Sequence, residues 1–447
     1  MEISFPTKAF RTHGGVHVPH HKNTSMMPTV EMPAPARVVL PMQQHIGGPC
    51  VPAVKKGDHV YVGTVVGEAQ AFVCAPIHAS VSGTVHSVEK VPLSNGALSD
   101  AVIIDSDGLM EPDPNLCPPQ IRTKEDLIQA ARDCGLVGLG GAGFPTHVKL
   151  NVPADKNIDT LIINVAECEP FVTADHREAI ENGWDLLSGV YLLKRILEID
   201  RVIIAVESNK PDVIDILRRI ADDKRYDPDD RVRVLPLPAR YPQGAEKVLI
   251  HACTNRIIPT GGLPADVGCI VMNISSVSAL ARYVETGMPL VKRRVTIDGS
   301  AIAEPKNVFV PLGTSIHDVI EFCGGYSKPA KKLISGGPMM GFAITDDSFP
   351  VLKSNNAFLV FEEKDAIISE PTACIHCGRC VQACPMNLVP TMLEKYTEMK
   401  NTEKLQDLDI MTCMECGCCA YSCPAHHRLV QSMRIGKALV KNAGRKS

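Results

Sequence analysis

Two copies of one cysteine spacing, CxxCxxCxxxCP, constrain this 447-residue chain more than any other feature. The first copy, CIHCGRCVQACP, covers residues 374–385, and the second, CMECGCCAYSCP, covers 413–424. Three thiolates within seven residues can hold three corners of an iron–sulfur cube, and in the bacterial two-cluster arrangement the fourth ligand comes from the opposite copy. The spacing therefore predicts two 4Fe-4S clusters, one on Cys374, Cys377, Cys380 and Cys423, the other on Cys413, Cys416, Cys419 and Cys384.

Structural zinc is the main alternative, because CxxC pairs also bind zinc. A tetrahedral zinc site needs only two such pairs and leaves the other cysteines and the proline of each copy unexplained. His376, His426 and His427 lie close by, yet cysteines alone complete both clusters. Cys418 is extra to the spacing, and its role stays open.

The remaining cysteines and the charge balance narrow the class of protein. An odd total of 17 cysteines, eight of them in tight clusters, indicates reduced thiols and a cytoplasmic location. Seven scattered cysteines are predicted to be small buried apolar residues: Cys50, Cys74, Cys117, Cys134, Cys253, Cys269 and Cys323. A net charge of -4 gives no general attraction for nucleic acid, so no nucleic-acid partner is expected. No window holds the roughly 18 uninterrupted apolar residues of a membrane span.

Strand and helix patterns predict a multidomain fold with α/β and α+β parts. Residues 1–107 contain short strands with glycine turns and resemble the barrel-sandwich hybrid of lipoyl and biotinyl carriers. A linker rich in Pro and Asp, 108–120, leads to alternating strands and helices in 121–290, which predict an α/β domain around a largely parallel sheet. Residues 291–350 look like a β-grasp, soluble ligand-binding module, and 365–447 form a helical two-cluster, ferredoxin-like domain.

A glycine loop, GLVGLGGAGFPTHVKL at 135–150, contains a literal GxGxxG match. A dinucleotide-binding fingerprint should follow a strand and open a helix, but the preceding TKEDLIQAARDCG predicts a helix. Four glycines in the six residues 138–143 still suit close approach of the backbone to a flat or phosphorylated ligand, because side chains would obstruct it. We therefore expect this loop to bind such a ligand, with Lys149 nearby.

Several motifs also resemble known families. The run GLGGAGFPTHVK is similar to the flavin mononucleotide (FMN) loop in the flavoprotein subunit of respiratory complex I. Further motifs, GGVHVPHHKNT, PIHASVSGTV, NVAECEPFVTADHRE and YPQGAEK, precede the paired cysteines in the order found in the family of C subunits of Rnf electron-transport complexes. This second resemblance covers nearly the whole chain.

The resemblance implies a non-covalent FMN and NAD(H) as substrate. It assigns to the flavin side Gly138, Gly140, Gly141, Gly143, Asn164, Glu167, Glu169 and Asn273, with Lys149 near the phosphate, and to the nucleotide Tyr241, Gly244 and Glu246. Where complex I has NADE and GEE, this chain has NVAE and GAE, so Ala166 and Ala245 replace two carboxylates. No Ser/His/Asp or Cys/His nucleophile stands out, as expected where a flavin carries out the chemistry.

The function implied is that of a peripheral component on the cytoplasmic side of the cell membrane, bound to membrane and peripheral subunits of an Rnf complex. It would exchange electrons among NADH/NAD+, FMN and both clusters, and reach ferredoxin through a partner subunit. Electron transfer between ferredoxin and NAD would drive Na+ or H+ translocation by the partners. Two alternatives stay open: a soluble flavin and iron–sulfur cobalamin reductase, against which the amino-terminal sandwich argues, and a non-catalytic scaffold that only relays electrons.

Overall fold

A four-stranded parallel sheet forms the centre of the chain in this computed structural model, which describes residues 5–153, 155–223, 227 and 229–444. The strand order is β11 (Val232–Leu237), β10 (Arg201–Glu207), β9 (Thr160–Val165) and β12 (Cys269–Asn273). Every neighbouring pair is parallel. Strands of such a sheet are apolar on both faces because helices cover both, and the α/β domain predicted from the sequence has this form.

The two faces of the sheet belong to different cores. Leu161 and Ile163 point into the larger core, and Ile162 points into a smaller one, as the two-residue period of a strand requires. The larger core includes α4 (Gly183–Ile196), α5 (Pro211–Ala221) and α7 (Ile274–Thr286), and the smaller includes α6 (Glu246–Thr254). A short 3-10 turn, η1 (Pro264–Val267), precedes β12.

Two small sheets make the amino-terminal sandwich. One has the order β2 (Arg37–Pro41), β8 (Leu98–Ser106), β7 (Gly83–Pro92), β4 (His59–Val60), and the other β3 (Val51–Pro52), β5 (Val65–Glu68), β6 (Ile77–His78). Alternate residues of β2 and β8, such as Val38 and Ile104, are fully buried between them. The barrel-sandwich prediction is confirmed.

The β-grasp module contains a six-stranded sheet and α8 (Ile316–Phe322). The order is β1 (Val30–Glu31), β14 (Lys306–Pro311), β13 (Lys292–Asp298), β17 (Ala357–Phe361), β15 (Lys332–Ser335), β16 (Phe342–Ile344). Because β17 pairs with both β13 and β15, the module runs beyond the predicted limit of residue 350 to Phe361.

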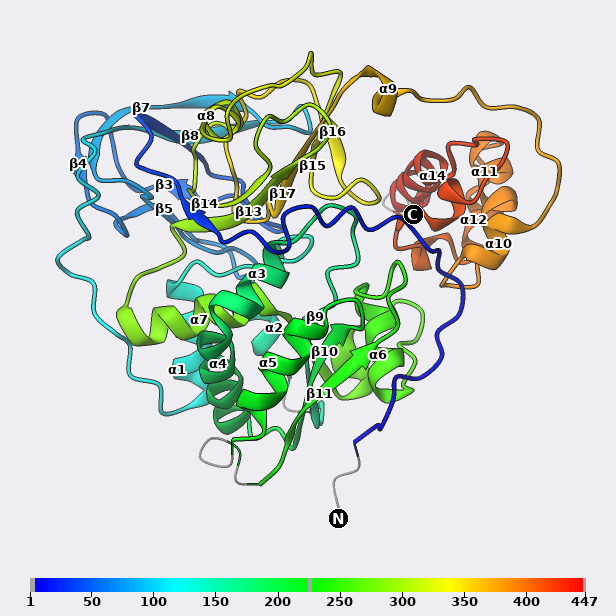
Figure 1. The fold of residues 1–447 in the computed structure, drawn as a ribbon, viewed down its shortest axis with the longest axis horizontal. Helices are drawn as coiled ribbons and strands as arrows, with labels where there is room; N and C mark the ends of the chain where they lie inside the picture. The colour runs from blue at the N-terminus through cyan, green and yellow to red at the C-terminus, as the bar shows by residue number, and fades with distance from the viewer. Residues whose placement is uncertain (1–4, 154, 224–226, 228, 445–447) are drawn as a thin grey trace.

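The first residues lie outside the two small sheets of the sandwich. Residues 5–29, hereafter the N-terminal strap, run in extended form past the parallel sheet and the carboxyl-terminal helices before β1 joins β14 (Figure 1). Their backbone pairs with distant segments, including Val16 with Tyr241 and Phe10 with Ala252. Such long-range pairing leaves no local pattern in the sequence.

The carboxyl-terminal domain is helical and lies to one side of the molecule, joined by an extended segment after α9 (Glu363–Ala366) (Figure 1). Its elements are α10 (Arg379–Ala383), α11 (Pro390–Glu398), α12 (Thr402–Asp407), η2 (Ile410–Thr412), α13 (Cys418–Tyr421) and α14 (Leu429–Gly444). Leu393, Leu405 and Met433 form its core. Among the described residues, no helix combines the length and apolar character needed to cross a bilayer.

One prediction about the scattered cysteines is wrong. Six of the seven are buried, whereas Cys117 is exposed. It lies in the 108–120 connection, where Pro and Asp residues keep the chain at the surface.

Candidate functional site

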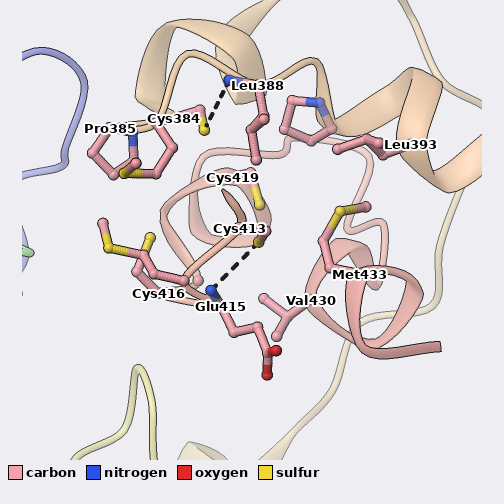
Figure 2. Close-up of a pocket in the computed structure, with 14 residues that line it drawn as sticks. Cys384, Pro385, Leu388, Leu393, Cys413, Glu415, Cys416, Cys419, Val430 and Met433 are labelled. Atoms are coloured by element: carbon pink, nitrogen blue, oxygen red, sulfur yellow. Dashed lines mark hydrogen bonds between the residues drawn. The ribbon is translucent and has the colours of Figure 1, made fainter. Parts of the chain in front are cut away.

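Four cysteines line a pocket in the carboxyl-terminal domain (Figure 2): Cys384, Cys413, Cys416 and Cys419. Apolar residues such as Leu393, Val430 and Met433 line the rest of it. The backbone N–H of Leu388 donates to Cys384 Sγ and that of Glu415 to Cys413 Sγ, each at 3.4 Å. Amide donors aimed at sulfur, within an apolar wall, suit anionic thiolates that hold a cluster.

The other four predicted ligands line a second pocket: Cys374, Cys377, Cys380 and Cys423. Each pocket thus takes three cysteines from one copy of the motif and the fourth from the other copy. His376 and His427 also line this pocket, and His427 Nδ1 lies 2.7 Å from Glu394 Oε2. The donor sets fit two 4Fe-4S clusters.

The two copies have the same backbone form. Three pairs of equivalent residues adopt the left-handed conformation: His376 and Glu415 at φ 54° and 58°, Gly378 and Gly417 at 73° and 82°, and Asn387 and His426 at 55° and 55°. Each copy then enters a short helix, α10 or α13. The repeat in sequence is therefore a repeat in structure.

Cys418 lies outside both pockets, although the sequence left its role open. It is fully buried, and its Sγ lies 3.9 Å from the Tyr241 carbonyl oxygen, which belongs to the α/β domain.

Burial raises the pKa of the Cys413 thiol, which lines the first pocket, to about 11. A bound cation would supply the charge that the thiolate form needs there.

The glycine loop connects two helices, α1 (Lys124–Asp133) and α2 (Thr146–Leu150), so it does not follow a strand. Its base is braced: Leu139 N–H donates to Ser276 Oγ at 3.0 Å, and Arg293 donates to Leu139 O at 2.8 Å. Its tip, residues 140–142, is exposed. The loop therefore presents bare backbone from a fixed base, as a site for a flat or anionic ligand requires.

Two asparagines stand at the carboxyl edge of the parallel sheet beneath this loop. Asn164 of β9 and Asn273 of β12 are direct neighbours in register. A Cβ atom added to Gly140 would overlap the Asn273 side-chain amide, so only glycine fits there. Asn273 itself caps α7 through Ser275 N–H at 2.9 Å and donates to Asp175 at 2.6 Å. The crevice outside the carboxyl ends of parallel strands is a common ligand site in α/β folds.

Three other predicted residues, Lys149, Gly244 and Glu246, also lie at this edge. Lys149 Nζ lies 3.2 Å from Glu246 Oε1 and donates to Val271 O at 2.9 Å. Asn164 Nδ2 donates to Gly244 O at 2.9 Å. The structure thus groups Lys149, Asn164, Gly244 and Glu246 with the glycine loop and Asn273. A half-exposed cation, side-chain amides and open backbone together suit a phosphorylated flavin.

Glu167 and Glu169 have internal partners. Glu167 accepts from the N–H groups of Asp175 and His176 at 2.6 and 3.2 Å, at the start of α3 (Ala174–Glu181). Burial, opposed by the Lys22 ammonium, raises the Glu167 pKa to about 7. Glu169 accepts from Met339 and Met340 N–H at 3.0 and 2.8 Å. Both carboxylates hold the backbone near the site.

Lys22 is a residue of this site that sequence reasoning missed. Its Nζ donates to the carbonyl oxygens of Glu167 and Glu169, each at 2.8 Å, and of Val172 at 2.5 Å. It lies within GGVHVPHHKNT, a motif noted only for its family resemblance. A lone lysine in an extended segment gave no sign of partners about 150 residues away.

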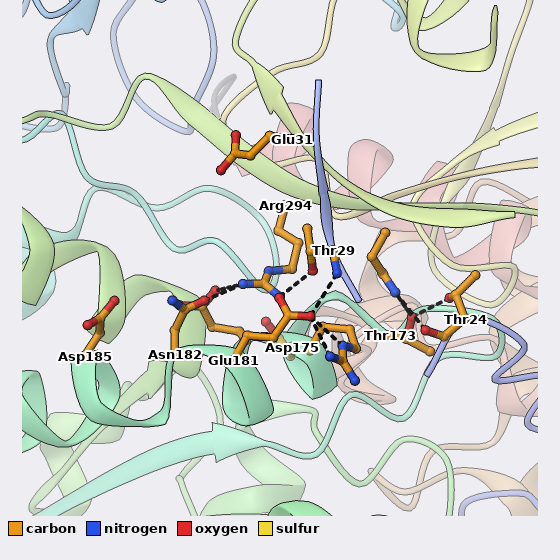
Figure 3. A network of polar contacts seen from close by, with 12 residues as sticks. Thr24, Thr29, Glu31, Thr173, Asp175, Glu181, Asn182, Asp185 and Arg294 are labelled. Atoms are coloured by element: carbon orange, nitrogen blue, oxygen red, sulfur yellow. Dashed lines mark hydrogen bonds and ion pairs between the residues drawn. The ribbon is translucent and has the colours of Figure 1, made fainter. Parts of the chain in front are cut away.

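Polar contacts fix the strap across α3 and β13 (Figure 3). Thr24 and Thr173 share a hydrogen bond of 2.5 Å, and Thr29 N–H donates to Glu181 at 2.9 Å. The buried guanidinium of Arg294 donates to Thr29 at 2.7 Å and to Glu181 at 2.5 Å. Because these groups are paired, the strap can lie over a buried polar surface without an unpaired charge.

Tyr241, predicted to lie beside the nucleotide, connects the α/β domain with the first cysteine pocket. It is 2% exposed, and its hydroxyl donates to the Cys416 carbonyl oxygen at 2.7 Å. Met339, which Glu169 binds, also lies next to Gly417. The pocket that contains Cys416 is therefore the one adjoining the α/β domain.

Comparison with protein families assigns each part of the chain. Residues 10–109 match the RnfC barrel sandwich hybrid domain, 131–282 the Nuo51 FMN-binding domain, 294–343 the SLBB domain, and 373–426 a 4Fe-4S dicluster domain. These matches confirm the predicted fold class and the predicted cofactor classes, FMN and 4Fe-4S clusters.

Individual relatives align over most of the chain. The C subunit of the proton-translocating ferredoxin:NAD(+) oxidoreductase complex of Clostridium ljungdahlii is 41% identical over 90% of this chain and 88% of its own length. The C subunit of the Na(+)-translocating complex of Acetobacterium woodii is 43% identical over 95% and 96%. An NAD+-reducing nickel–iron hydrogenase structure shares the fold with a TM-score of 0.51 at 18% identity, over 72% of this chain and 62% of its own.

Proposed function

Because the chain belongs to the family of C subunits of ion-translocating ferredoxin:NAD+ oxidoreductase complexes, we propose that it is the NAD(H)-reacting, electron-transferring subunit of such a complex. Its family relationships, with an FMN-binding domain and a dicluster domain on one chain, carry this proposal. Relatives at similar identity are named for protons and for Na+, so the coupling ion is left open.

The glycine loop and the carboxyl edge of the sheet would hold FMN without a covalent bond. Gly140 and Gly141 would allow the ring or phosphate to reach the backbone, and Lys149 would pair with the phosphate in place of Glu246. Asn164 and Asn273, neighbours at the carboxyl edge of the sheet, would line the flavin site. Gly138 and Gly143 would shape the loop, and Glu167 and Glu169 would hold the adjoining backbone through the contacts already described.

The two cysteine pockets would hold the 4Fe-4S clusters in the allocation predicted from spacing. FMN held there would supply hydride exchange with NAD(H) and one-electron release, and 4Fe-4S clusters held by the cysteines would supply one-electron transfer. The Cys384 and Cys413 pocket adjoins the α/β domain through Tyr241. The other pocket, where Cys377 and Ile375 are exposed, is the one open to approach by a partner protein.

The family relationship is the basis for proposing a location. We propose that the chain docks at the cytoplasmic face of the cell membrane on integral subunits, which move the ion, and that ferredoxin reaches it through another subunit. Affinity purification from gently solubilised membranes should recover integral membrane subunits with this chain. Recovery with a corrinoid protein and no membrane subunit would instead support a cobalamin reductase.

Cofactor content tests the chemistry. Protein purified without oxygen should contain one FMN and two 4Fe-4S clusters per chain, and NADH should bleach the flavin absorbance. Zinc in place of iron at the cysteine motifs would contradict the proposal. If the protein failed to bind added FMN, the alternative of a non-catalytic scaffold that only relays electrons would be favoured.

A further inference from the structure

Three metal-ligating side chains outside the FMN and cluster sites meet inside the barrel sandwich. His45 and Cys50 lie in the segment between β2 and β3, and Cys74 lies between β5 and β6. Their ligand atoms are all within 4.8 Å of one another. His45 is 7% exposed, Cys50 4% and Cys74 0%. Neither the family models nor the names of the relatives account for this cluster.

Two of the three separations among these atoms match the edges of a tetrahedral metal centre. Cys50 Sγ and Cys74 Sγ are 3.5 Å apart, and Cys74 Sγ and His45 Nε2 are 3.7 Å apart. Zinc bonds of about 2.3 Å to sulfur and about 2.0–2.1 Å to nitrogen give tetrahedral edges of about 3.8 Å between sulfurs and about 3.6 Å between sulfur and nitrogen. These two separations therefore need little adjustment, and the third, between Cys50 Sγ and His45 Nε2, is within 4.8 Å.

The Ala75 carbonyl oxygen is placed to act as a fourth ligand. The Ala75 carbonyl oxygen lies 3.2 Å from Cys50 Sγ and 3.2 Å from His45 Nε2. The other ring nitrogen, Nδ1, lies 3.1 Å from the Ile46 carbonyl oxygen. A proton on Nδ1 would donate to that carbonyl and leave the Nε2 lone pair facing the thiols, as second-shell contacts of zinc-bound histidines commonly do.

The charge balance favours a divalent cation that binds as two thiolates form. Two thiolates neutralise the ion, so the buried centre carries no net charge. Lys353 is buried nearby, but its Nζ donates to Pro76 O at 2.5 Å and Gly135 O at 2.8 Å and so has partners of its own. Two thiolates with one imidazole in tetrahedral form select zinc among the common divalent ions.

We propose that His45, Cys50, Cys74 and the Ala75 carbonyl oxygen bind one structural Zn2+. Binding forms two zinc–sulfur bonds, one zinc–nitrogen bond and one zinc–oxygen bond, and it releases two thiol protons to solvent. The Ala75 N–H, which lies 3.1 Å from His45 Nε2, gives up that contact to the ion. This assigns to Cys50 and Cys74 a role other than the apolar one predicted from the sequence.

The segments that carry the zinc ligands also contact the glycine loop and α2. Ile46 N–H donates to Gly143 O at 3.2 Å, and Phe72 O lies 3.0 Å from His147 Nε2 of α2. The two segments that supply the zinc ligands therefore also contact the carboxyl-terminal side of the glycine loop, at Gly143 and at His147 of α2. A metal that joins these segments would hold that side of the loop in place.

Metal analysis of the oxygen-free full chain tests the site, after equilibration with one equivalent of Zn2+ and removal of free metal. We expect one zinc per chain beyond the full complement of iron. X-ray absorption at the zinc edge should show two sulfurs at about 2.3 Å and two lighter ligands at about 2.0–2.1 Å. Cys50→Ser and Cys74→Ser should lose the zinc and keep the iron. Cys323→Ser, at a buried cysteine of the β-grasp module, is the matched control and should keep both.

Three results would overturn the proposal: no retained zinc, a shell of four sulfurs, or a Cys50–Cys74 disulfide in protein kept free of oxygen. The wild-type spectrum decides the matter even if a variant fails to fold. Hydrogen exchange gives a second readout that needs no flavin. Amides of residues 138–147 should exchange several-fold faster in Cys74→Ser than in zinc-loaded wild type, with β10 unchanged, and equal rates would contradict the bracing role.

Discussion

Lys149 is the residue whose charge most directly tests the flavin site, because Glu246 competes for it at 3.2 Å. Glu246→Gln should free Lys149 for the phosphate and tighten FMN binding by about 1 kcal/mol, roughly fivefold. Lys149→Glu should weaken binding by roughly tenfold or more, because it opposes the phosphate charge. Fluorescence titration of flavin-depleted protein measures both.

Lys156→Glu is the matched control for the charge change. Lys156 also pairs with a carboxylate, Asp266 at 3.0 Å, and is similarly exposed. It should change FMN affinity little, and an effect equal to that of Lys149→Glu would mean that only net charge matters.

Cys384 and Cys423 test the allocation of cluster ligands. Cys384→Ser should alter the paramagnetic resonance signal of the cluster on Cys413, Cys416 and Cys419, and Cys423→Ser that of the other cluster. The two variants serve as controls for each other. Signals that change in the opposite assignment would show that each copy of the motif supplies all four of its own ligands.

Glu167 gives the site a dependence on pH. Burial raises its pKa from an ordinary 4.5 to about 7, so the folded chain binds a proton that the unfolded chain has lost. The stability contributed by this group is complete below pH 4.5 and is lost as pH rises towards 7. Glu167→Gln cannot titrate, so its unfolding midpoint should fall less than that of wild type between about pH 5.5 and 7.5.

Thermal unfolding at a fixed scan rate measures this difference. Glu304→Gln provides the control, because Lys306 lowers the pKa of the exposed Glu304 carboxyl and its titration lies below that range. A pH profile of Glu167→Gln that is parallel to that of wild type would show that Glu167 is ionised throughout.

At the scale of elements, the N-terminal strap is held where Gly14 meets the first cysteine pocket. Gly14 has φ +59°, and an added Cβ would lie 2.6 Å from the Cys384 carbonyl carbon and 2.7 Å from Pro385 N. Gly14→Ala should therefore displace the Cys384 backbone and lower the iron content of the purified protein. Gly261→Ala has a similar φ of +75° with open space around it, so it separates backbone strain from the clash. Equal iron content in the two variants would rule out the clash.

The elements that the sequence predicts best are those with local signals. The helix before the glycine loop and the apolar strands such as β9 follow from periodicity. The grouping of cysteines from both copies of the motif in each pocket follows from cysteine spacing. The strap and β17 were missed because their partners are far away in the sequence. For the same reason no pattern near Glu169 revealed its bonds to Met339 and Met340.

At the scale of the whole molecule, the cluster domain stays in place through contacts with the strap and the α/β domain. The connection from β17 is extended, and Ile367 and Ile368 in it are 73% and 67% exposed. Gly15 N–H donates to Ala383 O at 2.9 Å, and Tyr241 donates to Cys416 O at 2.7 Å. Under the proposed function, electron transfer between the α/β domain and the clusters would depend on these contacts, because the extended connection does not fix the separation of the two domains.

Tyr241→Phe should therefore loosen the domains without disturbing either one. The substitution leaves the buried Cys416 carbonyl oxygen without its donor, which costs about 1–3 kcal/mol.

A protease site placed between Ile367 and Thr372 would cut the connection, and gel filtration would then report whether the cluster domain stays bound. Cut wild type should elute as one species. On dilution, cut Tyr241→Phe should release the cluster domain at a higher protein concentration than wild type does, and it should need less denaturant to do so. Tyr326→Phe, which removes an exposed hydroxyl bonded to Asp347 at 2.6 Å, should behave as wild type, because that contact joins no domains. If Tyr241→Phe released the domain no more readily than Tyr326→Phe, the strap rather than Tyr241 would set the position of the clusters.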